Sequence, residues 1–179
     1  MIVLTTSTGE SIKLEKELSR GGEGAVWTTD RKGYVAKIYN SPTPDRIEKL
    51  EVMVAHPPHD PNANHTSFAW PQSLLQDKYG QVLGFLMPEI EGGRELTQIY
   101  NPQHRKTHNL KIDWRFLHVT ALNVAAIIQA IHAEGYVLGD IKPQNILVNN
   151  RALPSIIDTD SFQVRHPSTG NIHHCLVAS

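Results

Sequence analysis

The chain has 179 residues, of which 40% are hydrophobic and 20% charged, and its formal net charge is −1. This composition is that of an ordinary folded domain and excludes disorder of the whole chain. The near-neutral charge gives no reason to expect a nucleic-acid partner or a membrane surface, and no uninterrupted apolar run reaches the roughly 18 residues of a membrane span. The lone Cys175 excludes an intramolecular disulfide, and no signal peptide is recognised, so we expect a cytoplasmic protein.

The first part of the chain is predicted to be rich in β-structure. Alternating apolar residues and turn residues predict five strands, Ile2–Thr5, Ser11–Leu14, Glu15–Arg20, Ala25–Thr29 and Tyr34–Tyr39, the first two forming a hairpin. A helix is predicted at Thr43–Ala55, with Ile47, Leu50 and Val54 on one face. After a loop rich in Pro, His and Asn, two further strands are predicted at Ala69–Leu75 and Gln81–Ile90.

The second part is predicted to be mostly helical. A short helix at Arg94–Asn101 is followed by a polar connector, Pro102–Lys111, and then by a long helix, Trp114–Glu134. Asp113 and Gly135 can cap that helix at its two ends. Its predicted inward stripe is Leu117, Ala121, Val124, Ala125, Ile128 and Ile131. Short strands are predicted at Tyr136–Leu138, Ile146–Val148, Ser155–Ile157 and Phe162–Val164.

The strongest chemical signal is a D-x-K-P-x-N loop that leads into an apolar strand, Gly139–Val148. A second aspartate, Asp158, follows the apolar run Ser155-Ile156-Ile157. Phosphoryl transfer from ATP needs a carboxylate to orient the acceptor hydroxyl, oxygen ligands for Mg²⁺, and positive charge beside the transferred phosphate. Asp140 fits the base, Lys142 the phosphate-facing cation, and Asn145 and Asp158 the metal ligands.

This set of residues resembles the protein-kinase family, specifically the bacterial Ser/Thr kinases, and the resemblance runs from about Leu18 to about Phe162. Ser19–Val26 is similar to the family's G-x-G-x-x-G-x-V loop, with Ser19 in place of the first glycine. The resemblance implies that the glycines of this loop let backbone N–H groups approach the phosphates of ATP. These glycines are Gly21, Gly22 and Gly24.

The resemblance continues at Val35-Ala36-Lys37, where Lys37 would contact the α- and β-phosphates. In the family this lysine pairs with a glutamate of the helix that follows. Glu51 is preferred because it lies four residues after Ile47 and so shares the predicted inward stripe, but Glu48 remains open.

Gly84–Gly93 resembles the strand that leads into the kinase hinge. The resemblance implies that Met87 is the gatekeeper, and that the Pro88 C=O and the Ile90 N–H bind adenine. A proline is acceptable at position 88 because only its carbonyl is needed there. The adenine ring would be held between apolar side chains of Val26, Val35 and Leu147.

Two motifs depart from the family. Leu138-Gly139-Asp140 stands in place of H-R-D, so control through a phosphorylated activation loop is not expected, and Gly139-Asp140 is similar to aminoglycoside and choline kinases. Asp158-Thr159-Asp160 stands in place of D-F-G, so a second carboxylate replaces a glycine that often permits loop movement. The run Asp158–Gln163 resembles a bacterial subfamily whose kinase domains lie beside helix-hairpin-helix modules.

The resemblance implies an α+β, protein-kinase-like fold. Residues 1–91 would be an antiparallel, β-rich N-lobe with one helix and an N-terminal hairpin, and residues 92–179 a partial, mostly helical C-lobe. The implied function is ATP- and Mg²⁺-dependent phosphorylation of Ser/Thr hydroxyls on a protein substrate that the sequence does not identify. Two alternatives remain open: a small-molecule kinase, suggested by Gly139-Asp140, and a nucleotide-binding scaffold without catalysis.

The chain is short for this family, because it ends 21 residues after Asp158. Kinases of the family continue through the activation segment and several more helices, which cover the long helix and the catalytic loop. We therefore expect a fragment, a natural truncation or a minimal kinase. Its C-terminal half would expose an apolar face, or self-association or a partner chain would cover that face.

Overall fold

The computed structural model describes residues 2–175, and their contacts divide into two compact units. Unit 1 contains residues 2–57, 70–89 and 166–173, and unit 2 contains residues 58–69, 90–165 and 174–175. The chain therefore crosses between the units at more places than the one boundary predicted between residues 91 and 92. The segments 58–69 and 166–173 each pack with the unit formed mainly by the other half of the chain.

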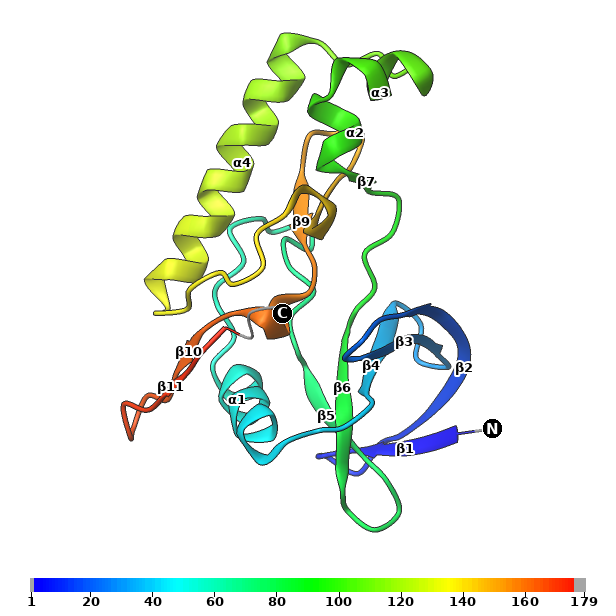
Figure 1. Cartoon of the computed structure of the whole chain (residues 1–179), viewed down its shortest axis with the longest axis vertical. Helices are drawn as coiled ribbons and strands as arrows, with labels where there is room; N and C mark the ends of the chain where they lie inside the picture. Colours follow the sequence, from blue (N-terminus) through cyan, green and yellow to red (C-terminus); the bar gives the residue numbers. More distant parts are fainter. Residues whose placement is uncertain (1, 176–179) are drawn as a thin grey trace. The chain divides into compact units, whose positions relative to one another are not determined.

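Unit 1 is built around a closed antiparallel barrel of six strands in the order β1-β2-β3-β4-β6-β5 (Figure 1). The strands are β1 (Ile2–Thr6), β2 (Ser11–Arg20), β3 (Gly24–Thr29), β4 (Tyr34–Tyr39), β5 (Ser73–Gln76) and β6 (Val82–Pro88). The barrel closes where β1 pairs with β5, with Thr5 opposite Gln76 and Thr6 opposite Leu75. The predicted strands were therefore placed correctly in outline, but the closure was not foreseen.

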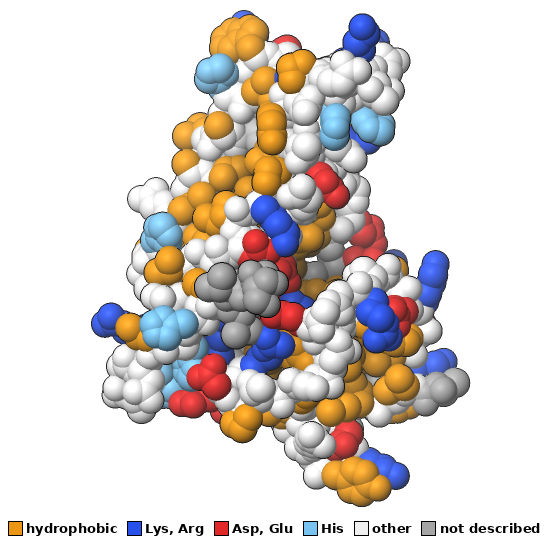
Figure 2. All heavy atoms as spheres, viewed as in Figure 1, with side chains coloured by type: hydrophobic (Ala, Val, Ile, Leu, Met, Phe, Trp, Pro, Cys, Tyr) orange, Lys and Arg blue, Asp and Glu red, His pale blue; other side chains and the backbone are white. Residues whose placement is uncertain are grey.

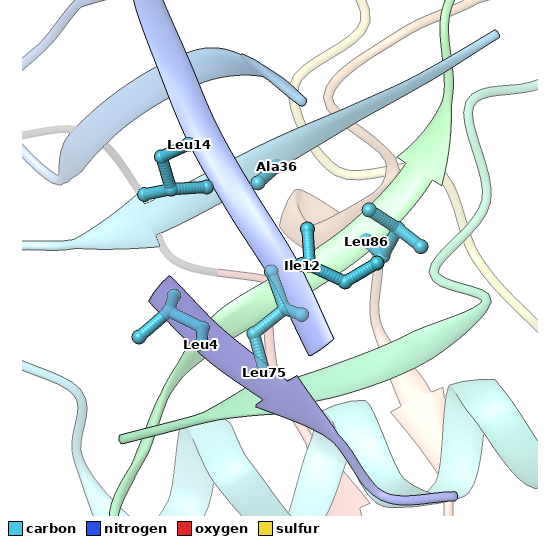
Figure 3. Packing of buried hydrophobic residues seen from close by; sticks show 6 residues of the cluster. All are labelled: Leu4, Ile12, Leu14, Ala36, Leu75 and Leu86. Carbon is cyan, nitrogen blue, oxygen red and sulfur yellow. The ribbon is translucent and has the colours of Figure 1, made fainter. Parts of the chain in front are cut away.

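Alternation along the strands fills the barrel with side chains. Figure 3 shows the cluster from five of the six strands, whose members are all less than 5% exposed: Leu4, Ile12, Leu14, Ala36, Leu75 and Leu86. Successive residues of a strand point to opposite faces, so the neighbours of Ala36, namely Val35 and Lys37, lie on the outer face of the barrel wall. Burial of this cluster holds the six strands in one register.

The predicted break at Glu15 is wrong, because β2 continues unbroken from Ser11 to Arg20. Its pairing with β3 shifts register between Leu14 and Glu17 and again between Glu17 and Ser19. Such bulges bend a strand while keeping it paired, and this allows one long strand to follow the curved barrel wall.

Helix α1 (Pro44–Ala55) begins where Thr43 caps it, since the Thr43 side chain accepts a hydrogen bond from the Arg46 N–H. It packs on the barrel through Leu50, Val52 and Met53, and Met53 accepts a hydrogen bond of 2.8 Å at its carbonyl from the buried Trp70 indole. Strand β11 (Ile172–His173) also packs on α1, where the buried His173 Nδ1 lies 2.8 Å from Asp45 Oδ1.

Unit 2 contains a small antiparallel sheet and three helices. The sheet has the order β7-β8-β9, formed by β7 (Arg94–Glu95), β8 (Ile146–Val148) and β9 (Pro154–Ile156). The helices are α2 (Leu96–Tyr100), α3 (Pro102–Thr107) and α4 (Trp114–Ala133). The remaining short elements are the 3₁₀ turns η1 (Pro143–Asn145) and η2 (Thr159–Ser161) and strand β10 (Val164–Arg165).

Four predicted elements of unit 2 differ from the structure, and one of them is the strand predicted at Phe162–Val164, which is β10 at Val164–Arg165. Arg94–Glu95 pairs as strand β7, so the helix predicted from Arg94 begins at Leu96. The predicted polar connector contains helix α3, because Asn101 accepts hydrogen bonds from the Gln103 and His104 N–H groups and Pro102 starts the first turn. The predicted strand at Tyr136–Leu138 is reduced to one bridge, between Val137 and Gln163.

The long helix α4 has the predicted start, because Asp113 Oδ1 accepts a hydrogen bond from the Phe116 N–H. Its predicted inward stripe is only partly correct: Ile131 is buried, but Ala121 and Ala125 are exposed, and the fully buried face also contains Thr120 and Ile127. The cause is that the helix is apolar around most of its circumference, so periodicity alone does not select a face.

Large apolar side chains of α4 remain exposed, among them Trp114 at 64% and Leu122 at 69%. Figure 2 shows hydrophobic surface running along this helix. By length and composition alone α4 could cross a membrane, although the core helix of a soluble protein passes the same test. An exposed apolar face was expected on this half of the chain; its coverage by another chain stays a prediction.

Candidate active site

The strand register brings four of the residues predicted to contact nucleotide onto one outer face of the barrel wall. Val26 of β3 lies directly opposite Lys37 of β4, and Val35 of β4 lies directly opposite Met87 of β6. Side chains of directly paired residues stand on the same face, and Val35 and Lys37 are two residues apart on one strand. The barrel therefore presents three apolar side chains and one lysine together.

Lys37 is only 9% exposed, which is unusual for a lysine, and its Nζ lies 5.8 Å from the ring centroid of Tyr39. The two glutamates considered as its partner, Glu51 and Glu48, are both exposed on α1. The buried residues of the helix are instead Lys49, Leu50, Val52 and Met53, so the pairing of Lys37 with Glu51 stays a prediction.

The glycine-rich turn between β2 and β3 contains glycines of two kinds. A Cβ at Gly24 would lie 2.2 Å from the carbonyl oxygen of Ile38, so a side chain at this position would collide with β4. A Cβ at Gly21 or Gly22 would meet no atom within 4 Å. The packing of the chain thus explains Gly24 but leaves the other two glycines without a structural requirement.

The predicted hinge begins at the end of β6. Met87 is buried, Pro88 is the last residue of the strand, and the Glu89 N–H donates to the Gly33 carbonyl at 2.9 Å. Ile90 is the first residue of this segment that belongs to unit 2. The Glu89 N–H is therefore hydrogen-bonded within unit 1. The groups predicted to bind adenine belong to the two neighbouring residues, Pro88 and Ile90.

In unit 2 the catalytic-loop residues predicted from the sequence lie together. Lys142 Nζ forms an ion pair with Asp140 Oδ2. Asn145 Nδ2 donates to the same carboxylate oxygen at 3.2 Å and to the Asp140 backbone carbonyl at 3.0 Å. The hydrogen bond from Lys142 is the largest effect and lowers the pKa of Asp140 below its ordinary value. Burial, the next largest effect, raises the pKa, and the Lys142 charge and the Asn145 amide add to the lowering. The carboxylate is therefore ionised at neutral pH.

The predicted metal ligands are held next to each other by the backbone. The Ile157 N–H donates to the Asn145 carbonyl at 2.9 Å, and Asp158 follows directly. The Asn145 amide nitrogen donates to Asp140, and the Asn145 Oδ1 lies on the opposite side of the amide group. This oxygen can serve as a metal ligand. An amide oxygen and the Asp158 carboxylate are the ligand chemistry that Mg²⁺ prefers, so the residues fit this ion.

Gly139 is fixed by packing. A Cβ at this position would lie 2.2 Å from the Ser161 carbonyl oxygen and 3.1 Å from the Cys175 sulfur. The glycine allows the loop that carries Asp140 to approach the turn that follows Asp158. Packing within unit 2 therefore explains why residue 139 is a glycine. The similarity of Gly139-Asp140 to small-molecule kinases is not needed to explain it.

A shallow hollow in unit 2 lies beside these residues. Its lining includes the three catalytic-loop residues Asp140, Lys142 and Asn145, together with the apolar side chains of Ile146 and Phe162. Leu147, predicted to contact adenine, is partly buried in β8, paired with Ser155 and Glu95. The sequence prediction recorded Thr159 only as a departure from D-F-G, but this residue proves to be one of the most deeply buried polar residues of unit 2, at 1% exposed.

Solved structures show which fold the chain has. Two solved structures with the same fold are the ROP18 kinase domain in complex with AMP-PNP and sucrose, and a Toxoplasma gondii rhoptry antigen kinase domain. Both are 16% identical to this chain in sequence. Their TM-scores are 0.61 and 0.59, they cover 91% and 92% of this chain, and the chain covers 56% of each of them. The chain has a protein-kinase-like fold, with a β-rich part and a partial helical part, as predicted.

Sequence comparison finds bacterial relatives that are named protein kinases. The chain is 37% identical over 180 residues to protein kinase YegI of Escherichia coli strain K12, and 36% identical over 178 residues to that of strain O157:H7. These matches include 98% and 97% of this chain but only 27% of each relative, so the chain spans about a quarter of their length. No protein-family model matches the sequence.

Proposed function

We propose that the chain is the phosphoryl-transfer unit of an ATP- and Mg²⁺-dependent kinase that phosphorylates Ser/Thr hydroxyls of proteins. The observation that carries the proposal is the cluster of Asp140, Lys142 and Asn145, held beside Asp158 by a backbone hydrogen bond. The similarity to protein kinase YegI and the kinase fold support the same reaction class.

In this proposal each residue has one task. Asp140 is ionised and accepts the proton of the acceptor hydroxyl, and Lys142 keeps that carboxylate charged. Asn145 and Asp158 would hold Mg²⁺, which when bound neutralises charge on the phosphates. Lys37 would hold the phosphates, with Val26, Val35 and Met87 contacting the base, because these four side chains share a face. Gly21 and Gly22 leave space for a ligand to approach the backbone.

The test is transfer of radiolabelled phosphate from ATP to a Ser/Thr peptide library and to the chain itself, in wild type and Asp140→Asn. Loss of the base should lower turnover by about 10²- to 10⁴-fold, while Mg²⁺-dependent ADP affinity stays within a few-fold because the ligands Asn145 and Asp158 remain. Asp77→Asn is the matched control, since Asp77 accepts two N–H groups in a surface turn and asparagine keeps that role. Unchanged transfer in Asp140→Asn would refute the assignment of the base.

Two other outcomes separate the remaining alternatives. Phosphorylation of aminoglycosides or amino alcohols, with none of peptides, would replace the protein acceptor by a small molecule. Binding of ADP and Mg²⁺ without any transfer would make the chain a nucleotide-binding scaffold.

A further inference from the structure

One end of unit 2, formed by α3, the connector after it and the first turn of α4, concentrates positive charge. Residues 102–118 contain three histidines and four basic residues, Arg105, Lys106, Lys111 and Arg115. The same stretch contains a single acidic residue, Asp113, so its formal charge is +3 with the histidines neutral, in a chain whose total is −1. The near-neutral charge of the whole chain therefore conceals a strongly basic region, which we call the cationic end.

The backbone holds the members of the cationic end close together. The Leu110 N–H donates to the Arg105 carbonyl at 2.9 Å and folds the connector back onto α3. Lys111 follows directly, and two residues later Asp113 caps α4 through the Phe116 N–H. Figure 1 shows α3 and the start of α4 at the same end of the unit, and Figure 2, drawn from the same side, shows basic, histidine and hydrophobic side chains gathered there. The four basic residues thus belong to one compact stretch of surface.

Helix stability does not account for Arg115 and Trp114. Arg115 lies in the first turn of α4, where the helix dipole disfavours a cation. Trp114 is 64% exposed, although burial of so large an apolar ring would stabilise the fold. The Arg115 guanidinium carbon lies 5.5 Å from the Trp114 ring centroid, and the His118 ring lies edge-on to the same ring at 5.6 Å. The surface therefore presents an aromatic ring and a cation side by side, at a cost in stability that a ligand would explain.

The basic side chains of the cationic end are available to a partner. Lys106, Lys111 and Arg115 are exposed, and Arg105 is half-buried, with its guanidinium 3.5 Å from the Ile99 carbonyl. In the part of the chain that the structure describes, none of the four basic side chains forms an ion pair. An anionic partner would therefore gain attraction here without breaking a salt bridge.

The apolar surface beside these cations selects among anionic partners. Val119 and Leu122 follow Arg115 at the helical spacings of four and seven residues, and both are exposed. A nucleic-acid backbone or an acidic peptide supplies negative charge, whereas the surface of a bilayer supplies anionic headgroups and apolar acyl chains together. Basic residues around an exposed tryptophan at the start of an apolar helix face are the pattern of a segment that binds at a membrane interface.

We propose that the cationic end of unit 2 binds the surface of a membrane that contains anionic lipids. Lys106, Lys111 and Arg115 contact the headgroups, and the Trp114 ring inserts between them. Each basic residue near an anionic lipid surface contributes about fivefold to the affinity, so several of them together give measurable binding. This membrane contact is independent of the proposed kinase activity, and either can be wrong without the other.

The experiment measures co-sedimentation of the protein with sucrose-loaded vesicles of phosphatidylcholine, prepared with and without phosphatidylglycerol. We expect binding only when phosphatidylglycerol is present, and weaker binding at high salt. The triple variant Lys106→Gln/Lys111→Gln/Arg115→Gln should lose about 100-fold in affinity, since three contributions of about fivefold are removed. The matched control is Lys16→Gln/Lys32→Gln/Lys78→Gln, which removes three exposed lysines of unit 1 and changes the net charge equally; it should stay within about 3-fold of wild type.

Trp114→Phe tests insertion of the ring separately from charge. Wild-type tryptophan emission should shift to shorter wavelength when anionic vesicles are added, and Trp114→Phe should bind but lose that shift, because Trp27 and Trp70 belong to unit 1. Circular dichroism checks the fold of every variant. If the triple glutamine variant does not fold, Lys106→Gln/Lys111→Gln, which leaves α4 intact, replaces it with an expected loss of about 25-fold.

Four results would overturn the proposal. They are equal binding to vesicles with and without phosphatidylglycerol, wild-type affinity in the glutamine variant of the cationic end, an equal loss in the unit 1 control, and an emission shift that persists in Trp114→Phe. Binding to polyglutamate or polyuridine with none to anionic vesicles would also overturn it, because the partner would then be an acidic protein or a nucleic acid.

Discussion

The two units position their candidate functional residues by different means. In unit 1, Val26, Lys37, Val35 and Met87 are placed by strand pairing over a filled barrel core, so many backbone hydrogen bonds share the task. In unit 2, individual side-chain hydrogen bonds contribute to placing the catalytic loop and the Asp158 turn, and half of the residues of the neighbouring helix α4 are exposed.

The difference matters for how each unit should respond to change. A barrel register is cooperative, because shifting one strand by one residue would turn its whole buried face outward. A loop held by single side-chain hydrogen bonds has no such cooperation, so the loss of one donor or acceptor is felt directly at the site. We therefore expect stability to depend mainly on the core of unit 1, and chemistry to depend on single atoms of unit 2.

The largest effect on stability should come from the barrel core. Leu75→Ala removes a fully buried side chain and should cost about 2–5 kcal/mol of unfolding free energy. Leu122→Ala, on the exposed side of α4, should change it by less than about 0.5 kcal/mol. Urea denaturation followed by circular dichroism measures both. If Leu122→Ala lowered the unfolding free energy as much as Leu75→Ala, the contrast between the two units would be wrong, because another surface would have to cover α4 in solution.

The next effect concerns the close approach of two loops in unit 2. Gly139→Ala would place a Cβ 2.2 Å from the Ser161 carbonyl oxygen, so one of the loops must move. We expect a cost of about 1–3 kcal/mol and a loss of turnover of up to about 100-fold, since displacement of a catalytic group by about 1 Å can have that effect.

Gly22→Ala is the matched control for this prediction, because its Cβ would meet no atom within 4 Å and should leave the unfolding free energy within about 0.5 kcal/mol of wild type. Denaturation of the two variants is compared, and phosphate transfer is measured for Gly139→Ala against wild type. A Gly139→Ala protein with wild-type stability and turnover would show that the contact between these loops is not required.

Local chemistry fixes the features that were easiest to predict, and the roles of the site residues stay predictions. The start of α4 follows from Asp113 as cap, and the Asp140, Lys142 and Asn145 cluster lies within one short loop whose backbone brings the three side chains together. The Asn101-Pro102 pair carried the same kind of signal for α3, but the polar sequence that follows was interpreted as a connector.

What could not be predicted depends on partners distant in the sequence. The closure of the barrel requires Thr5 to meet Gln76, and no local pattern encodes that pairing. The inward face of α4 is selected by its neighbours in unit 2, since apolar residues surround most of the helix. Thr159 was noted only as part of the departure from D-F-G, because its hydrogen bond to the Ala69 carbonyl joins residues 90 positions apart.

A smaller effect is expected for the pH dependence of transfer. Lys142 lowers the pKa of Asp140, so in Lys142→Met that pKa rises towards its ordinary value. The group with a lowered pKa is ionised down to a lower pH, so the acidic limb of the rate profile should move to higher pH in the variant. Profiles of kcat/KM that extend down to about pH 3, below the ordinary aspartate value, test this prediction, with Lys78→Met, a lysine of a surface turn in unit 1, as control. An unmoved acidic limb would show that the profile does not report Asp140.

The smallest effect is spectroscopic and tests how well unit 2 excludes water at the end of α4. Tyr136 is only 3% exposed, and burial, together with the nearby Glu134 charge, raises its pKa to about 12. Because the folded pKa is above the unfolded value, the stability contributed by the neutral phenol is present below about pH 10 and is lost as the pH rises towards 12. The difference between alkaline absorbance titrations of wild type and Tyr136→Phe isolates this phenolate, and its midpoint should lie near pH 12. A midpoint near pH 10 would mean that water reaches the Tyr136 phenol, so that this side chain is not buried in solution.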